Sequence, residues 1–199
     1  PWWSISFLLV TAHTALRTGL TPGSALLLAM VAVWALRLWF HLLHRARGQP
    51  EDPRYQAFRQ RFGPERYWWF SYFQVFLLQG GLALLISAPL QVAASAPSPD
   101  DLTGFDMAGA LVFGFGFVFE VVADRQLAAF RADAGNRGRI LDTGLWRWSR
   151  HPNYFGEAAL WWGLGLCALD QPSGWATLLA PALMTFLLVR VSGVSLLDA

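Results

Sequence analysis

The residues best placed to do chemistry are ionisable side chains inside an apolar stretch that begins near residue 105. Glu120, Asp124 and Arg131 follow one another at intervals of four and seven residues, so they share one face of a helix. Ionisable groups inside a membrane span are costly and usually face one another or a polar cavity. The plainer alternative is that Asp124 pairs with a nearby Arg only to neutralise the end of a helix.

A second polar group follows in the run 150–157, Arg-His-Pro-Asn-Tyr-Phe-Gly-Glu. Pro152 suits the first turn of a helix, where a missing N–H is not needed. Asn153 and Glu157 lie four residues apart, so they point the same way at a helix N-terminus, which favours anions. Four Arg residues add positive charge: Arg131, Arg139, Arg147 and Arg150. These residue types predict a pocket for a pyrophosphate or a phosphorylated nucleotide.

Two further candidates lie in an earlier apolar stretch. Arg37 and His41 are four residues apart, and either could polarise a substrate oxygen as a proton or hydrogen-bond donor. Both have a plainer alternative, because Arg37 can extend to the membrane surface and His41 can cap an interfacial helix end. His41 and His44 lack a third ligand, so we expect no metal site.

The composition indicates a protein solvated by lipid. Of 199 residues, 55% are hydrophobic and 14% are charged, whereas soluble domains have about 25% charged residues. A transmembrane helix needs about 20 apolar residues. The chain therefore predicts one all-α domain, residues 1–199, a polytopic transmembrane helix bundle. Its six spans are expected at about 2–18, 24–44, 69–94, 105–130, 153–170 and 174–196.

The loops between these spans differ sharply in charge. Segment 45–68 contains six Arg residues and segment 131–152 contains five, whereas the opposite loops hold only Arg17, beside Asp100, Asp101 and Asp170. Arg-rich loops stay on the cytoplasmic side of a membrane. We therefore expect a multi-pass protein of a bacterial inner membrane with its polar site facing the cytoplasm. That these Arg residues only fix the topology remains an alternative.

Other classes of function find little support. No Gly-x-Gly-x-x-Gly motif follows a strand pattern, so a Rossmann domain is excluded and a dinucleotide would have to bind within the membrane fold. Nucleic-acid binding is not expected, because the Arg clusters lie close to the membrane plane. Cys167 stands alone, so it supports neither a disulfide framework nor a cysteine metal site.

Taken together, these motifs resemble the C-terminal catalytic domain of the steroid 5-alpha-reductase family, especially its bacterial branch of uncharacterised membrane proteins. The resemblance rests on Glu120, Asp124, Gln126, Arg131, the Gly-Leu-Trp turn at 144–146 and the run 150–157. It is close over 105–170, the expected cofactor-binding core, and loose over 24–104. It implies a seven-span family fold and NADPH-dependent reduction of a carbon–carbon double bond conjugated to a ketone. The implied substrate is a small hydrophobic enone, such as a 3-oxo-4-ene steroid, with no obligate protein partner.

The resemblance also implies roles for individual positions. The cofactor-binding positions would be Glu120, Asp124, Arg131, Arg139, Arg150, His151, Asn153, Tyr154, Glu157 and, in the last span, Arg190. At 120 the family often has Asn, so this Glu is a departure. The family's catalytic Glu and Tyr would fall at or before Pro1 and near Trp34. We therefore take Arg37, His41 and Glu157 as the catalytic candidates.

Two alternatives of other classes remain. A membrane methyltransferase that uses S-adenosylmethionine would share the Arg-His-Pro tripeptide and the membrane architecture. A non-enzymatic membrane protein, such as a carrier or an assembly factor, would need its charges only for topology. The latter predicts that the polar residues of the fourth and fifth spans do not converge in space.

Overall fold

The computed structural model describes residues 2–47, 53–95 and 101–191. Within these ranges the chain forms helices and no strand, which confirms the all-α fold class. The predicted loop breaks at 48–50 and 96–99, and the end of the sixth predicted span at 192–196, lie outside the described residues.

The first two helices form a hairpin that matches the predicted spans. α1 (Trp2–Thr18) is followed after a short turn by α2 (Pro22–Ala46). Thr21 caps α2: its hydroxyl accepts a hydrogen bond from the Ser24 N–H, and the Ser24 hydroxyl accepts one from the Thr21 N–H. Such reciprocal capping satisfies N–H groups that a helix start leaves unpaired. The turn thus fixes where the longer helix begins.

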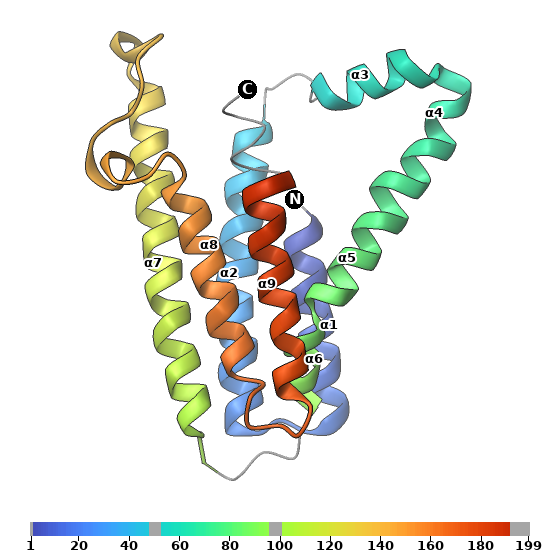
Figure 1. Cartoon of the computed structure of the whole chain (residues 1–199), viewed down its shortest axis with the longest axis vertical. Coiled ribbons are helices and arrows are strands. Elements are labelled where there is room, and N and C mark those ends of the chain that lie inside the picture. Colours follow the sequence, from blue (N-terminus) through green and yellow to red (C-terminus); the bar gives the residue numbers. More distant parts are fainter. Residues whose placement is uncertain (1, 48–52, 96–100, 192–199) are drawn as a thin grey trace.

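The third predicted span, 69–94, is interrupted. α3 (Pro53–Phe62) is followed by α4 (Pro64–Ser71), the wider turns of η1 (Tyr72–Leu77) and α5 (Leu78–Ile86), and a break at Ser87 precedes α6 (Ala88–Ser95). Pro89 lacks the N–H that would continue α5 into α6. In Figure 1, α4 and α5 slant away from the other helices, whereas α6 lies within the bundle.

The remaining chain forms the helices that carry most of the predicted site. α7 (Gly104–Ala132) ends in a connection that holds two short turns, η2 (Ala134–Asn136) and η3 (Gly144–Arg147). α8 (Pro152–Leu166) follows, and the chain continues through η4 (Gly174–Leu178), α9 (Leu179–Phe186) and η5 (Leu187–Val191). Within the described residues, three helical stretches are long and apolar enough to cross a membrane: 22–46, 65–86 and 104–132. With the shorter apolar helices they form a membrane helix bundle.

Glycines bring α7 and α8 into close contact. A methyl group at Gly116 would lie 2.4 Å from the Leu160 backbone nitrogen, and one at Gly156 would lie 2.6 Å from the backbone nitrogen of Glu120. Gly163 packs in the same way against Phe113. Small residues allow membrane helices to approach backbone to backbone. This contact sets the register in which Glu120 and Glu157 face each other.

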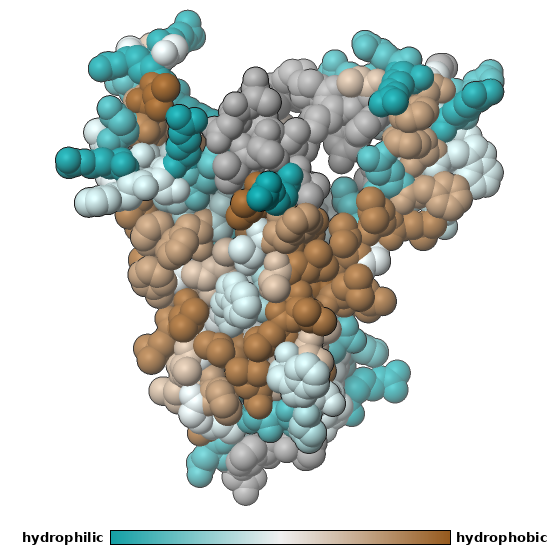
Figure 2. All heavy atoms as spheres, in the orientation of Figure 1, coloured by the Kyte–Doolittle hydropathy of each residue, from teal (hydrophilic) through white to brown (hydrophobic). Residues whose placement is uncertain are grey.

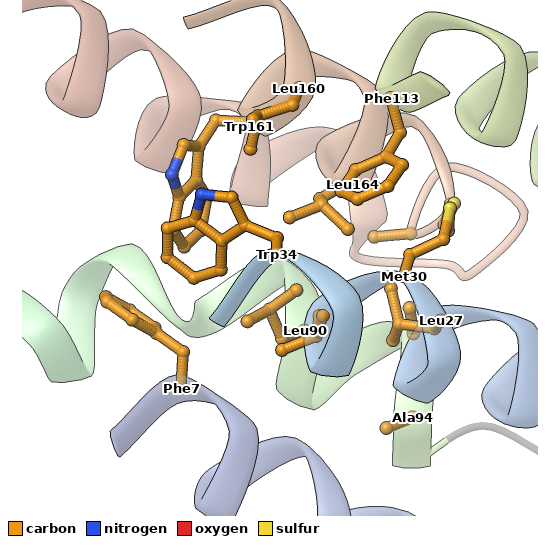
Figure 3. Packing of buried hydrophobic residues seen from close by; sticks show 14 of the residues in the cluster. Phe7, Leu27, Met30, Trp34, Leu90, Ala94, Phe113, Leu160, Trp161 and Leu164 are labelled. Atoms are coloured by element: carbon orange, nitrogen blue, oxygen red, sulfur yellow. The ribbon is translucent and has the colours of Figure 1, made fainter. Parts of the chain in front are cut away.

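The apolar core lies where α1, α2 and α8 meet. Trp34 and Trp161 have no exposed surface, and their ring centroids are 5.3 Å apart in an edge-to-face arrangement. Phe7 packs edge-on against Trp161 at 4.9 Å, as Figure 3 shows. Aromatic rings in such geometry stabilise a core beyond the area they bury. The core therefore fixes α2 against α8 directly beside the polar site.

The surface has the polarity of a membrane protein. Figure 2 shows an apolar band at mid-height, with hydrophilic residues gathered toward both ends. The helices alternate in direction, so α3 and the connection between α7 and α8 lie at the same end (Figure 1). The two Arg-rich segments therefore share one end of the bundle, as their charge predicted.

Candidate functional site

The centre of the site is an ion cluster around Arg37. The guanidinium group of Arg37, on α2, forms ion pairs with the carboxylates of both Glu120 and Asp124, on α7. The side chains of Arg37, Glu120 and Asp124 are 19%, 5% and 11% exposed. A guanidinium group presents a planar set of donors that can serve two carboxylates at once. Arg37 is thus directed into the bundle, and its plainer alternative, extension to the membrane surface, does not hold.

Asp124 joins this cluster to α8. Its Oδ1 accepts a hydrogen bond from the side-chain amide of Asn153 at 3.3 Å, and its Oδ2 lies 3.8 Å from Nε2 of His41. Asp124 therefore contacts three residues on two other helices: Arg37 and His41 on α2, and Asn153 at the start of α8. The predicted polar faces of the fourth and fifth spans do meet at this point.

Glu157 occupies the inner end of the cluster. Its two carboxylate oxygens accept hydrogen bonds from the indole N–H groups of Trp34 and Trp161, each at 3.1 Å. Glu157 is buried and interacts with Glu120 across the contact between α7 and α8. The two indoles hold the Glu157 carboxylate in place: Trp34 donates from α2, and Trp161 donates from α8, the same helix as Glu157.

Two oxygen atoms of the cluster are buried without a hydrogen-bond partner among the described residues: Oε2 of Glu120 and Oδ1 of Asn153. Buried acceptors of this kind are rare in folded proteins, because each costs the free energy of a lost hydrogen bond. Both lie next to Asp124, since Glu120 is one helical turn away on α7 and Asn153 donates to Asp124. The Glu120 carboxyl also interacts with that of Glu157, so Oδ1 of Asn153 is the acceptor of the cluster that has no partner among the described residues.

The connection between α7 and α8 is fastened to α7 beside this cluster. The Leu145 N–H donates to the Gln126 side chain at 3.0 Å, and the Trp146 indole donates to the Ala123 carbonyl at 3.0 Å. Gly144 has a φ of +60° and packs against the Gln126 side chain. A residue with a side chain would be strained in that conformation. The Gly-Leu-Trp turn therefore anchors the loop to α7.

This loop and the end of α7 enclose a cavity of about 620 Å³. Four of its lining residues are Arg: Arg131, Arg137, Arg139 and Arg150. Asp133 and Asp142 also line it, so the charge of its walls is mixed with a positive excess. The volume falls within the range of about 300–1,000 Å³ that is usual for ligand pockets. Leu127 and His151 mark its inner side, one turn from Asp124 and two residues from Asn153.

The predicted site residues thus fall into two adjoining groups. Arg37, His41, Glu120, Asp124, Asn153 and Glu157 form the ion cluster. Arg131, Arg139, Arg150 and His151 line the cavity, and the Tyr154 ring stacks on His151 at 5.3 Å. Arg190 is exposed on η5 and does not line the cavity. Arg131 was expected on the same helix face as Asp124, but Arg131 lines the cavity and Asp124 does not, because seven residues of helix separate them by about 10.5 Å.

Trp34 and Trp161 were not predicted as parts of the site. A signal for both exists in the sequence, because Trp161 lies four residues after Glu157 and Trp34 lies three before Arg37. Residues at these spacings share a helix face. The departure at position 120 also has a structural explanation, since Glu120 is one of the two partners of Arg37.

Comparison with known proteins places the chain in a family. All of it, residues 1–199, matches the family described as "Protein of unknown function (DUF1295)". The chain belongs to this family. It is also similar to an uncharacterised protein of the fission yeast Schizosaccharomyces pombe, C594.04c, with 29% identity over 150 residues. That alignment covers 65% of this chain and 43% of the yeast protein, so the chain matches less than half of its relative. No solved structure matches the chain significantly.

Proposed function

We propose that this member of the DUF1295 family is a membrane-embedded reductase that uses NADPH to reduce a carbon–carbon double bond conjugated to a ketone. The observation that carries the proposal is the direct adjacency of the two groups. A cavity with four Arg residues, lined also by Leu127, lies within one helical turn of a cluster that holds an unpaired amide oxygen, Oδ1 of Asn153. One ligand with phosphates at one end and hydrogen-bond donors at the other would suit both the Arg-lined cavity and the ion cluster.

NADPH has that distribution of groups. Its phosphates suit the Arg residues of the cavity, because Arg binds phosphate through two parallel hydrogen bonds. Its carboxamide N–H and ribose O–H groups can donate hydrogen bonds to the oxygens of Glu120 and Asn153. The carboxylate of Asp124 would not bind phosphate, so its role is to orient Arg37 and Asn153. These assignments agree with the positions that the resemblance to steroid 5-alpha-reductases implies.

The proposed substrate is a small hydrophobic enone taken from the bilayer, such as a 3-oxo-4-ene steroid. The apolar core and the lipid-facing helices offer an environment in which such a molecule is soluble. When bound, NADPH supplies a hydride to the β-carbon of the enone. The site lies at the Arg-rich end of the bundle, and the excess of Arg at this end supports a cytoplasmic location for it.

The two alternatives are less consistent with the geometry. A non-enzymatic carrier predicted polar residues on separate faces, yet Asp124 and Asn153 are hydrogen-bonded to each other. S-adenosylmethionine is a sulfonium cation without phosphate, so a cavity lined by four Arg residues is poorly matched to it.

Calorimetric titration of the purified protein in detergent tests the proposal. NADPH is expected to bind at least about tenfold more tightly than NADH, because hydrogen bonds to a charged phosphate each contribute about 1.5–3 kcal/mol. S-adenosylmethionine serves as the comparison ligand and is expected not to bind. Equal affinity for NADPH and NADH, or binding of S-adenosylmethionine alone, would refute the assignment of the Arg cavity.

A further inference from the structure

Among the ionisable residues of the cluster, His41 has the most exposed side chain and also has a carboxylate partner. Its side chain is 34% exposed, compared with 11% for Asp124 and 5% for Glu120. Its Nε2 lies 3.8 Å from Oδ2 of Asp124, a distance at which a carboxylate stabilises an imidazolium ion electrostatically. His41 is therefore the most exposed of these titratable side chains and lies beside the buried carboxylate of Asp124.

The other candidate proton donors of the cluster are committed elsewhere. Arg37 is bound to two carboxylates, and guanidinium groups do not lose a proton in proteins. Trp34, near the position where the family resemblance would place a catalytic Tyr, is fully buried and donates its N–H to Glu157. Glu157 is enclosed by two indole donors. Glu120 is paired with Arg37, interacts with Glu157 and is only 5% exposed. Among the described residues of the ion cluster, His41 is therefore the most exposed candidate acid.

We propose that His41, held by Asp124, is the catalytic acid that protonates the reduced enone. This inference rests on the proposed function. In the reaction, a bound NADPH would supply the hydride, losing one C–H bond while a new C–H bond forms at the β-carbon. The electron pair of the double bond moves toward the ketone oxygen to give an enolate. The N–H bond of the His41 imidazolium then breaks, and its proton is delivered to the α-carbon.

After each turnover a proton from water restores the starting state, and no other reactant is needed. His41 is left as neutral imidazole and regains a proton from water at its exposed side. The net reaction consumes one NADPH and one solvent proton and yields NADP⁺ and the saturated ketone. Asp124 acts as a positioning residue, because it orients the imidazole and favours its charged form, as carboxylates do in other His–Asp pairs.

The acid predicts a dependence of turnover on pH. Only the imidazolium form can donate, so kcat is expected to fall as the pH rises through the range in which His41 loses its proton. The charged and titratable groups around His41 are Asp124 on α7 and Arg37, Arg45 and His44 on its own helix. Partial burial of the imidazole disfavours the imidazolium most, and Arg37, Arg45 and His44 disfavour it as well; Asp124 is the neighbour that favours it.

The test compares His41→Gln with two matched variants. His44→Gln changes the next His of α2, which is exposed and outside the ion cluster. Tyr154→Phe removes the phenol hydroxyl and keeps the ring that stacks on His151. NADPH oxidation is followed from pH 6 to 9 with progesterone as the probe, and NADPH binding is measured by calorimetry. We expect His41→Gln to lower kcat by about 100-fold, the lower end for a lost general acid, and to abolish the fall at high pH. Its NADPH affinity should stay within about twofold, added imidazole should restore part of the rate, and His44→Gln should behave as wild type.

Several results would overturn the proposal. Wild-type kcat in His41→Gln at every pH, or loss of the pH dependence in Tyr154→Phe instead, would show that His41 is not the acid. A parallel loss of NADPH binding and kcat in His41→Gln would show a structural role. If the wild-type protein binds NADPH but none of the enones tested causes it to oxidise NADPH, the proposed function fails together with this inference. Wild-type turnover with an unaffected His41→Gln removes the inference alone.

Discussion

Replacing Arg37 with Ala is expected to destabilise the protein by about 3 kcal/mol, the lower end for a broken buried ion pair. The substitution leaves the carboxylates of Glu120 and Asp124, which are 5% and 11% exposed, without their shared cation. The lower end is chosen because Arg37 itself keeps 19% of its surface exposed. For a chain of this size the midpoint of thermal unfolding in detergent should fall by roughly 6–12 °C.

Two further variants separate charge from shape in this experiment. Arg45→Ala, in the exposed last turn of the same helix, should change stability by less than about 0.5 kcal/mol, as exposed substitutions usually do. The triple variant Arg37→Met, Glu120→Gln, Asp124→Asn removes the guanidinium and both carboxylates at nearly constant volume. It should recover most of the lost stability while remaining unable to bind NADPH productively. An Arg37→Ala midpoint equal to wild type would show that the ion pairs do not hold α2 to α7.

The double substitution Arg131→Ala, Arg139→Ala is expected to weaken NADPH binding by about 100-fold or more with little change in stability. Both residues line the cavity and both are exposed. A hydrogen bond to a charged group contributes about 1.5–3 kcal/mol, so each lost Arg should cost about tenfold or more in affinity. Neither substitution opens a cavity in the apolar core, so the unfolding midpoint should stay near that of the wild type.

Arg125→Ala provides the matched control for this cavity variant. Arg125 is exposed on the same helix but does not line the cavity. Its NADPH affinity should equal that of the wild type when both are titrated by calorimetry at the same ionic strength. If all three proteins bind NADPH equally, the phosphates lie elsewhere. If Arg125→Ala weakens binding as much as the double variant, the effect is general surface charge rather than the cavity.

Local spacing was sufficient to predict which residues share a helix face. Glu120 and Asp124 lie one turn apart on α7, and Asn153 and Glu157 lie one turn apart on α8. The preference of proline for the first turn of a helix likewise predicted the start of α8 at Pro152. These features depend on residues close in sequence, which helix periodicity determines directly.

Contacts between helices distant in sequence could not be predicted in the same way. The double pairing of Arg37 and the donation from Trp34 to Glu157 span 83 to 123 residues of chain. They depend on the register of α2, α7 and α8, which the glycine contacts and the aromatic core establish. The break at Ser87 was missed although Pro89 signals it in the sequence, because the apolar residues on both sides of Pro89 were counted as one continuous span.

Transfer of deuterium from labelled NADPH to an enone tests the central claim most directly. The wild-type protein, reconstituted in lipid, would be incubated with progesterone and NADPH deuterated at both C4 positions, and the steroid would be analysed by mass spectrometry and NMR. The proposed reaction predicts a saturated ketone with one deuterium at the β-carbon and one solvent-derived hydrogen at the α-carbon, and Asn153→Ala should give none. Unlabelled product, or no NADPH oxidation with progesterone or with any of a panel of isoprenoid enones, would contradict the account.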